Sequence, residues 1–356
     1  LINKLKKDNI FVFILFFSIS GFKFATAKNE QAPYTLAPLD IIWIWKKIFK
    51  MLKPNCIIVN RHEFWPAFIY ATNIMHIPLI LINASNSSKS RLSIFTKILF
   101  MKSFDLICVI SEEDYYFYSK YLPINKIFIS GDTKYDRVIE RLEVYKSQIN
   151  NLKALFERRY PQLKRFILGS AWKPDIEYAL KAYAQINTKY PNMWQLIIAP
   201  HDINKENINW IKNKCTTYNY PFVCFSELEH KECTTHNNNN NIDIIIIDII
   251  GILFELYGSC QACMIGGALH NKIHNVLEPA AHGLFLCYGP RFYDQKEAII
   301  LKEHNLARII YMPIDLYKFW EELLTNELKY NHKIKEQILK MCGATEIIYD
   351  KLKQYL

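Results

Sequence analysis

The stretch 266–283, GGALHNKIHNVLEPAAHG, holds the residue types that a nucleotide-binding turn needs. A short apolar run at 262–265 leads into two glycines, a polar turn and a helix start that carries Asn275 and Glu278. Glycine lets the backbone approach a ligand closely, and a helix N-terminus offers unpaired N–H groups to a phosphate. A carboxylate at the same place can accept hydrogen bonds from sugar hydroxyls. The stretch therefore predicts a nucleotide site.

The same residues also permit a purely structural interpretation. Asn275 and Glu278 have the spacing of a capping box, in which the two side chains only close the end of a helix. Pro279 favours another register, because proline prefers the first helical position and would make Glu278 the cap. Both registers place the two side chains at the start of the helix. Ligand binding and helix capping therefore remain equally good interpretations of this stretch alone.

Short apolar runs alternate with helical patterns along the whole chain, as they do in α/β proteins. The expected strands form two series, at 10–17, 56–59, 79–82, 106–110 and 126–130, and at 166–168, 195–199, 243–247, 263–265 and 284–287. With 356 residues, the chain is long enough for two domains. We expect domains at 1–145 and 146–356, joined through an amphipathic stretch at 138–159, with the last helix packed on the first domain. The run 10–17 reads as a buried parallel strand.

The composition fits a globular chain that meets an anionic partner. Apolar residues make up 51% of the chain and charged residues 22%, and the net charge is +10. Residues 1–150 carry most of this charge, with 20 Lys and Arg against 12 Asp and Glu. Lysines alternate with aromatic residues in 43–53, a pattern typical of membrane surfaces, and no RNA-binding signature is present. We expect an anionic membrane surface, and no nucleic acid, as the partner.

The cysteines and histidines predict neither a disulfide framework nor a metal site. The nine cysteines are odd in number and irregularly spaced. Cys260 and Cys263 form a CxxC without a second pair. His230, Cys233 and His236 could ligate zinc, but the asparagine run that follows them favours a surface loop. No run reaches the roughly 18 apolar residues of a membrane span.

Seven blocks in one order resemble those of the Kdo transferases, which add 3-deoxy-D-manno-octulosonic acid (Kdo) to the lipid A precursor of Gram-negative lipopolysaccharide. The blocks are FFSISGF, HEFWP, GDTKYDRV, GSAWKPD, IIAPHD, DIIGILFELY and IGGALHNKIHNVLEPAAHG. Their residues are similar to those of the Bacteroidetes versions. The resemblance covers essentially the whole chain. It implies the GT-B glycosyltransferase architecture, two facing Rossmann-like domains with parallel sheets, the acceptor on the first and the nucleotide-sugar donor on the second.

The resemblance implies a site for the donor CMP-Kdo and needs no metal or cofactor. This donor site falls on Gly169, Ser170, Pro200, His201, Ile250, Gly251, Ile252, Asn275, Val276, Leu277 and Glu278. In the first domain, Glu63 and Lys134 match family residues that stabilise the transition state. A lysine ammonium close to a departing phosphate is well suited to that role. For Glu63, a carboxylate that only favours the entry of a helix after Trp65 is the structural alternative.

The chain also departs from the family pattern in its donor loops. Ile252 stands where many members have an acid, and Ile273 where many have glycine. His201 directly follows Pro200, without the arginine that often lies between them. Loss of that guanidinium would weaken the contacts with phosphate unless Lys173 or Lys272 compensates.

The family's catalytic base, a glutamate in an ASxGE-like loop, and the membrane-associated helix before it have no match in these residues. The implied reaction is an inverting transfer to lipid IVA, in which that carboxylate takes the proton of the acceptor hydroxyl. Because loss of a general base costs about 10² to 10⁴ in rate, we expect residues 1–356 to bind CMP but to transfer Kdo poorly. The expected location is the cytoplasmic face of the inner membrane, as a peripheral protein. The alternatives are a non-catalytic nucleotide-sugar-binding remnant or scaffold, and a nucleotide-sugar epimerase that uses uridine diphosphate donors.

Overall fold

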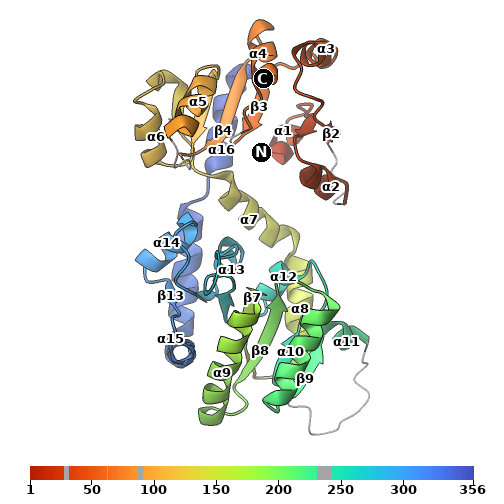
Figure 1. Ribbon diagram of the computed structural model, residues 1–356, viewed down its shortest axis with the longest axis vertical. Coiled ribbons are helices and arrows are strands. Elements are labelled where there is room, and N and C mark those ends of the chain that lie inside the picture. The colour runs from red at the N-terminus through yellow and green to blue at the C-terminus, as the bar shows by residue number, and fades with distance from the viewer. Residues whose placement is uncertain (28–31, 62, 87–90, 231–241) are drawn as a thin grey trace. The chain divides into compact units, whose positions relative to one another are not determined.

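The computed structural model describes residues 1–27, 32–61, 63–86, 91–230 and 242–356 (Figure 1). The chain forms two compact units: unit 1 comprises Leu1–Asp136 and Met341–Leu356, and unit 2 comprises Arg137–Lys340. The division falls within helix α7 (Thr133–Val144), earlier than the expected boundary after residue 145. Both units are built on parallel sheets, so the expected α/β fold class is confirmed.

Unit 1 is centred on a parallel sheet of order β3-β4-β5-β6. Its strands are β3 (Ile57–Asn60), β4 (Leu79–Ala84), β5 (Leu106–Val109) and β6 (Ile127–Ile129). Runs of apolar residues favour strands that are buried on both faces. Alternate side chains of β4 accordingly enter two cores: Leu79 and Leu81 lie in one, and Ile80 and Ile82 in the other.

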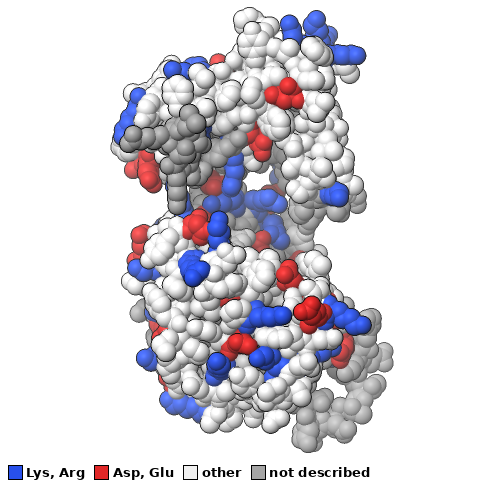
Figure 2. Space-filling view, viewed as in Figure 1, with Lys and Arg blue, Asp and Glu red and all other residues white. Residues whose placement is uncertain are grey.

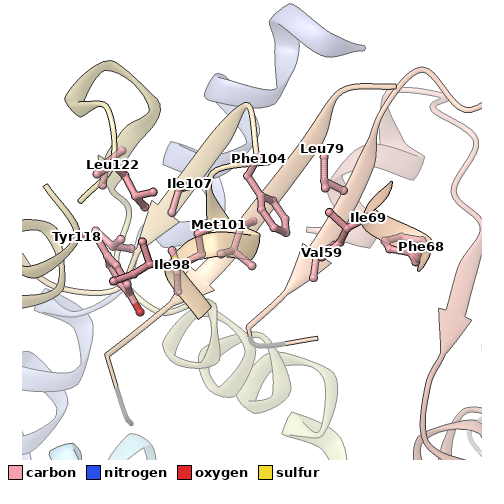
Figure 3. Packing of buried hydrophobic residues seen from close by; sticks show 14 of the residues in the cluster. Val59, Phe68, Ile69, Leu79, Ile98, Met101, Phe104, Ile107, Tyr118 and Leu122 are labelled. Atoms are coloured by element: carbon pink, nitrogen blue, oxygen red, sulfur yellow. The ribbon is translucent and has the colours of Figure 1, made fainter. Parts of the chain in front are cut away.

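Helices cover both faces of this sheet. The first core, shown in Figure 3, joins the sheet to α3 (Ile42–Leu52), α4 (Pro66–Ile74), α5 (Arg91–Met101) and α6 (Glu112–Tyr118). The second core receives Ile348 and Leu352 from α16 (Ala344–Leu352). The end of the chain therefore belongs to unit 1. The short 3-10 helices η1 (Ile124–Lys126) and η2 (Lys353–Tyr355) also lie in this unit.

The described residues of 1–36 include a smaller parallel sheet of two strands. They contain α1 (Ile2–Lys7), β1 (Ile14–Phe16), α2 (Ile19–Ala27) and β2 (Tyr34–Leu36), and β1 pairs with β2. The parallel strand expected at 10–17 is present but shorter, and the expectation that it is buried is wrong. Only Ile14–Phe16 are strand, they are half-buried, and Phe11 is 75% exposed. A two-stranded sheet has no inner strand, so β1 cannot be buried as the inner strands β4 and β5 are.

Unit 2 contains a seven-stranded parallel sheet of order β13-β12-β11-β7-β8-β10-β9. Its strands are β7 (Lys164–Ala171), β8 (Trp194–Pro200), β9 (Phe222–Cys224), β10 (Ile244–Ile246), β11 (Ala262–Ile265), β12 (Phe285–Tyr288) and β13 (Ala307–Ile309). The chain enters at β7, adds β8, β9 and β10 on one side, and then crosses to add β11 to β13 on the other. The strand order thus reverses between β7 and β11, the position at which doubly wound sheets bind ligands.

The helices of unit 2 pack around this sheet. They are α8 (Lys146–Arg159), α9 (Lys173–Lys189), α10 (Lys205–Thr217), α11 (Phe225–His230), α12 (Leu253–Tyr257), α13 (Leu277–His282), α14 (Lys296–Glu303) and α15 (Pro313–Lys340). The stretch expected to be one connector, 138–159, is divided between α7 and α8 at Tyr145. Among the helices of the described residues, none combines the length and the apolar character that a bilayer crossing requires.

Candidate functional site

A cavity of about 430 Å³ opens in unit 2 at the carboxyl ends of β7, β8 and β10. This volume lies within the range of roughly 300–1,000 Å³ typical of small-molecule sites. The lining residues are Ser170, Ala199, Pro200, His201, Asp202, Ile203, Asn204, Ile247, Ile249, Ile250, Gly251 and Leu253. The structure thus brings together five of the predicted donor residues, which are Ser170, Pro200, His201, Ile250 and Gly251. The other six predicted donor residues lie outside this lining.

Two backbone irregularities shape the cavity. Ser170 has a φ of 52°, and the pairing of β7 with β8 shifts between Leu168 and Ala171 around it. Gly251 has a φ of 97°, and a Cβ there would meet no heavy atom within 4 Å. Ile250 beside it is 84% exposed. A ligand in this cavity would therefore find open space over Gly251 and an apolar side chain next to it.

Gly169, one residue before Ser170, has a packing role. It is buried in β7, and a Cβ at this position would lie 2.2 Å from the hydroxyl oxygen of Tyr257. That tyrosine is itself buried, at 2% exposure. Gly169 is therefore required by the neighbouring helix α12, whose N-terminal cap is the predicted donor residue Ile252.

The two glycines after β11 also have packing roles. A Cβ at Gly266 would lie 2.3 Å from the carbonyl oxygen of Ser170, and one at Gly267 would lie 2.1 Å from that of Lys272. The Gly267 N–H donates to Oδ2 of Asp175 over 3.0 Å, and the Trp172 N–H donates to the same oxygen over 2.9 Å. Burial raises the pKa of the Asp175 carboxyl, and these two hydrogen bonds oppose the rise. The buried carboxylate thus ties the end of β7 to the end of β11.

Three aromatic rings stack beside the cavity. The ring of His201 lies 4.5 Å from that of Trp172 and 4.4 Å from that of His274, nearly parallel to both. Trp172 Nε1 donates a hydrogen bond of 2.9 Å to Nε2 of His274. Burial lowers the pKa of His274, and the neighbouring His201 and His270 lower it further. His201 is thus held by residues that follow β7 and β11.

The start of α13 differs from both capping registers expected for it. The helix begins at Leu277 after the cap residue Val276, and Asn275 Oδ1 accepts the Leu277 N–H over 2.9 Å. Pro279 is therefore the third helical residue. Proline is tolerated there because the first-turn N–H groups have no partner within the helix. Asn275 closes a turn ahead of the helix instead of capping it in a box with Glu278.

Glu278 forms an ion pair within unit 2. Its Oε1 lies 2.5 Å from Nη1 of Arg141, with the two side chains 25% and 31% exposed. The Arg141 guanidinium also lies 4.0 Å from the centre of the Phe254 ring, a distance suited to a cation–π contact. Since Arg141 is remote in sequence, spacing could not have identified this pair. A ribose hydroxyl that binds Glu278 would have to share the carboxylate with Arg141.

The residues predicted for catalysis, Glu63 and Lys134, lie in unit 1. Glu63 is exposed, and its carboxylate accepts a bond of 3.2 Å from Trp65 Nε1. Lys134 Nζ lies 3.3 Å from the buried Asp132, and Arg61 Nη2 lies 3.7 Å from the same carboxylate oxygen. Two cations therefore flank one buried carboxylate at the carboxyl ends of β3 and β6.

The carboxylate at the entry of α4 is not Glu63. Asp40 accepts hydrogen bonds from the backbone N–H groups of Ala67 and Phe68, over 3.0 and 2.9 Å, and from Trp45 Nε1 over 2.9 Å. Asp40 therefore performs the helix-entry role that was the structural alternative for Glu63. Only the fold brings Asp40 to this helix, so the sequence contained no local signal for it.

The two lysines that could compensate for the missing arginine differ in their surroundings. Lys173 Nζ lies 3.9 Å from Glu206 and 5.5 Å from the centre of the Trp210 ring, whereas Lys272 is exposed. In the CxxC, Cys260 donates to the carbonyl of Leu256, and burial raises the pKa of both thiols.

A zinc site was not expected in this chain. Two of the residues considered for zinc, Cys233 and His236, lie outside the described residues. Within the residues described, no group of His, Cys, Asp and Glu side chains is suited to hold a metal ion.

Sequence comparisons find 3-deoxy-D-manno-octulosonic acid transferases among the proteins similar to this chain. The family profile of 3-deoxy-D-manno-octulosonic-acid transferase (kdotransferase) matches residues 1–137. The 3-deoxy-D-manno-octulosonic acid transferase of Aquifex aeolicus is 29% identical over 325 residues, which are 90% of this chain and 78% of that protein. The enzyme of the same name from Haemophilus influenzae is 24% identical over 331 residues, which are 90% and 74% of the two chains.

The fold also resembles solved structures. The UDP-GlcNAc 2-epimerase of Neisseria meningitidis, solved with UDP-GlcNAc bound, matches with a TM-score of 0.64 and 15% identity, over 96% of this chain and 91% of that one. At this identity the likeness concerns the fold alone. It confirms the expected GT-B architecture with parallel sheets.

Proposed function

Because this chain belongs to the Kdo transferase family, we propose that it transfers Kdo from CMP-Kdo, bound in the cavity of unit 2, to lipid IVA, the precursor of lipid A. The observation that carries the proposal is the lining of that cavity. Residues from the ends of three strands meet there, and five of them were predicted as donor residues from their blocks in the sequence. The ion pair of Glu278 and the stacked ring of His201 lie in the same unit.

The chemistry of the lining suits a cytidine monophosphate. The Ser170 hydroxyl and the His201 imidazole can donate hydrogen bonds to phosphate oxygens. The exposed Ile250 offers an apolar surface to the base, and the open space over Gly251 leaves room for the ligand. We assign the ribose hydroxyls to Glu278, because a carboxylate accepts two such bonds and discriminates strongly against sugars that lack them.

The transfer itself is a displacement at the anomeric carbon of Kdo. The acceptor hydroxyl forms the new C–O bond, the bond to the phosphate breaks with inversion, CMP leaves, and a carboxylate takes the hydroxyl proton. We propose that Lys134 stabilises the charge that develops in this step, since a positioned ammonium is suited to that role. We propose that Glu63 also stabilises the transition state of this reaction. Residues 1–356 alone are proposed to transfer Kdo slowly, because none of their acids matches the family's general base.

The proposed membrane contact lies on α3 in unit 1. Trp43 and Met51 are 70% and 72% exposed, and Lys47, Lys50 and Lys53 are exposed as well. Figure 2 shows basic side chains over this helix, at the upper right. Exposed aromatic and basic residues on one helix favour an anionic lipid interface. We therefore propose that unit 1 lies on the cytoplasmic face of the inner membrane, where the lipid acceptor would be reached.

Titration calorimetry with nucleotides tests the donor assignment. CMP should bind purified residues 1–356, and UMP should bind more weakly, because cytosine and uracil differ in their hydrogen-bonding edge. Ser170→Ala should weaken CMP binding, whereas Ser119→Ala, an exchange in unit 1, serves as the matched control and should leave it unchanged. Tighter binding of UDP than of CMP would favour the nucleotide-sugar epimerase instead. If the protein binds CMP but transfers no Kdo, even when a general base is added to replace the family's glutamate, the result would favour the non-catalytic remnant.

A further inference from the structure

The stacked rings beside the cavity have a definite order. Trp172 and His274 lie almost in one plane, with 14° between their rings, and the bond from Trp172 Nε1 to His274 Nε2 joins their edges. The ring of His201 lies flat on both of them, 4.5 Å and 4.4 Å away. We call Trp172 and His274 the ring platform. His201 is the only member of the three that lines the cavity.

The hydrogen bond within the platform determines the state of His274. Indole Nε1 is only a donor, so Nε2 of His274 must offer a lone pair and the ring proton must lie on Nδ1. A second proton on His274 would occupy Nε2 and break the bond. It would also add a positive charge beneath His201.

The surroundings keep His274 in the neutral form. The ring of His270 lies edge-on to Trp172, 5.6 Å away, and its charge when protonated opposes that of His274. The carbonyl of His270 accepts a bond from the Arg291 guanidinium, a further cation on this loop. The acids nearby serve other groups: Asp175 binds the backbone of Trp172, and Asp202 lies 4.0 Å from Nε2 of His201. Lys272 is exposed on the same loop.

These contacts give the platform a role that the family motifs do not describe. His201 is 37% exposed at its side chain, so the cavity alone does not fix its ring. A flat surface of two joined rings restricts that ring to one plane and contacts only its face. Its nitrogen atoms stay at the ring edge, where Nε2 lies 4.0 Å from Asp202. Restricting a side chain before binding lowers the entropy cost of the contact it makes.

We propose that the ring platform of Trp172 and His274 positions His201 to bind the phosphate of the donor. Trp172 is thus a positioning residue, since it acts through His201. The inference rests on the proposed donor site in unit 2. It predicts that damage to the platform weakens binding of the phosphate and leaves binding of the nucleoside unchanged.

The test compares two ligands and two variants. Trp172→Phe keeps a stacked ring and removes the Nε1 donor. Trp194→Phe is the matched control in the same unit, at the start of β8 and at the opposite end of the strand from Pro200. Calorimetry at pH 7.5 measures the Kd of each protein for CMP and for cytidine. Because loss of a neutral hydrogen bond is worth about 0.5–1.5 kcal/mol, the Kd of Trp172→Phe for CMP should rise about two- to tenfold. Its Kd for cytidine should not change, and Trp194→Phe should match the unaltered protein with both ligands.

Two further measurements separate positioning from general damage. Histidine NMR should show the pKa of His274 higher in Trp172→Phe than in the unaltered protein, since the bond to its neutral form is gone. In a His201→Ala background, Trp172→Phe should cause no further loss of CMP affinity, because its effect passes through His201. His274→Leu removes the same bond from the other side, and it should reproduce the selective loss if Trp172→Phe does not fold.

Three results would overturn the inference. These are an unchanged Kd for CMP in both platform variants, an equal loss of CMP and cytidine affinity, and additive losses in the His201→Ala background. If instead the proposed function is wrong, the unaltered protein itself should bind no CMP. The ring platform would then have no assigned ligand.

Discussion

Replacement of Glu278 by glutamine separates the two interpretations that the sequence left open for 266–283. If Glu278 binds the ribose, the exchange removes charge-assisted hydrogen bonds to the hydroxyls. Such bonds are worth about 1.5–3 kcal/mol, so the Kd for CMP should rise roughly 10- to 150-fold. If Glu278 only stabilises the fold, the Kd should stay the same.

The structure also sets the expected cost to stability. The Glu278–Arg141 pair is 2.5 Å long, but its side chains are 25% and 31% exposed, so solvent screens it. A pair of this kind contributes about 1 kcal/mol, which corresponds to a Tm change of about 2–4 °C in a unit of this size. Arg141→Gln breaks the same pair from the other side and leaves the Glu278 carboxylate in place. Both variants should therefore lose similar stability.

The two variants should differ in ligand binding. Calorimetry with CMP and with 2′,3′-dideoxy-CMP measures the contribution of the hydroxyls directly. The unaltered protein and Arg141→Gln should prefer CMP, whereas Glu278→Gln should bind the two nucleotides about equally. An unchanged preference in Glu278→Gln, together with the same fall in Tm as in Arg141→Gln, would refute the ribose assignment and leave a structural ion pair.

Three other predictions follow from the contacts in the two units. Gly266→Ala should destabilise unit 2 by about 1–3 kcal/mol in urea unfolding, because its Cβ would lie 2.3 Å from a backbone oxygen, whereas no loss would show that this loop can move. Burial lowers the pKa of His282 from the ordinary 6.5 to about 4, and the positive charge of Lys335 contributes to this decrease. Between these two pKa values the unfolded chain binds more protons than the folded one. The contribution of His282 to the free energy of unfolding should therefore be fully present above pH 6.5 and fall by up to about 3 kcal/mol as the pH decreases to 4. The His282→Gln variant should show a flatter dependence of stability on pH, and an unchanged slope would contradict the prediction. Exchange of Lys47, Lys50 and Lys53 for glutamine should weaken binding to anionic vesicles on the order of a hundredfold, at roughly 1 kcal/mol per lysine, and unaltered sedimentation would exclude α3 as the contact.

The central strands could be predicted from the sequence because their apolar runs are long and bounded by turns. The strands β4 and β8 lie where the pattern placed them, extended by a residue or two. The edge strands β9 and β13 were missed, since each has only three residues and a run of that length does not differ from a buried loop. The run 10–17 failed for the opposite reason: it is apolar, but within the part of the chain that the structure describes it pairs with the short β2 alone.

Several residues that line the cavity of unit 2 could be found from their sequence blocks, but the contacts of these loops could not. Ser170, His201 and Gly251 meet in one cavity, although their blocks are far apart in the chain. The partners that decide how the side chains act come from elsewhere: Arg141 for Glu278, Trp172 for His274, and Asp40 in place of Glu63. Such pairs depend on which strand ends adjoin, and spacing along one chain does not contain that information.

A co-crystal structure with CMP would show directly whether unit 2 binds the donor nucleotide. The nucleotide should lie in the cavity of unit 2, with its phosphate within hydrogen-bond distance of Ser170 and His201 and its ribose at Glu278. Density for CMP at any other place, or a cavity that stays empty at saturating nucleotide while CMP binds in solution, would contradict it.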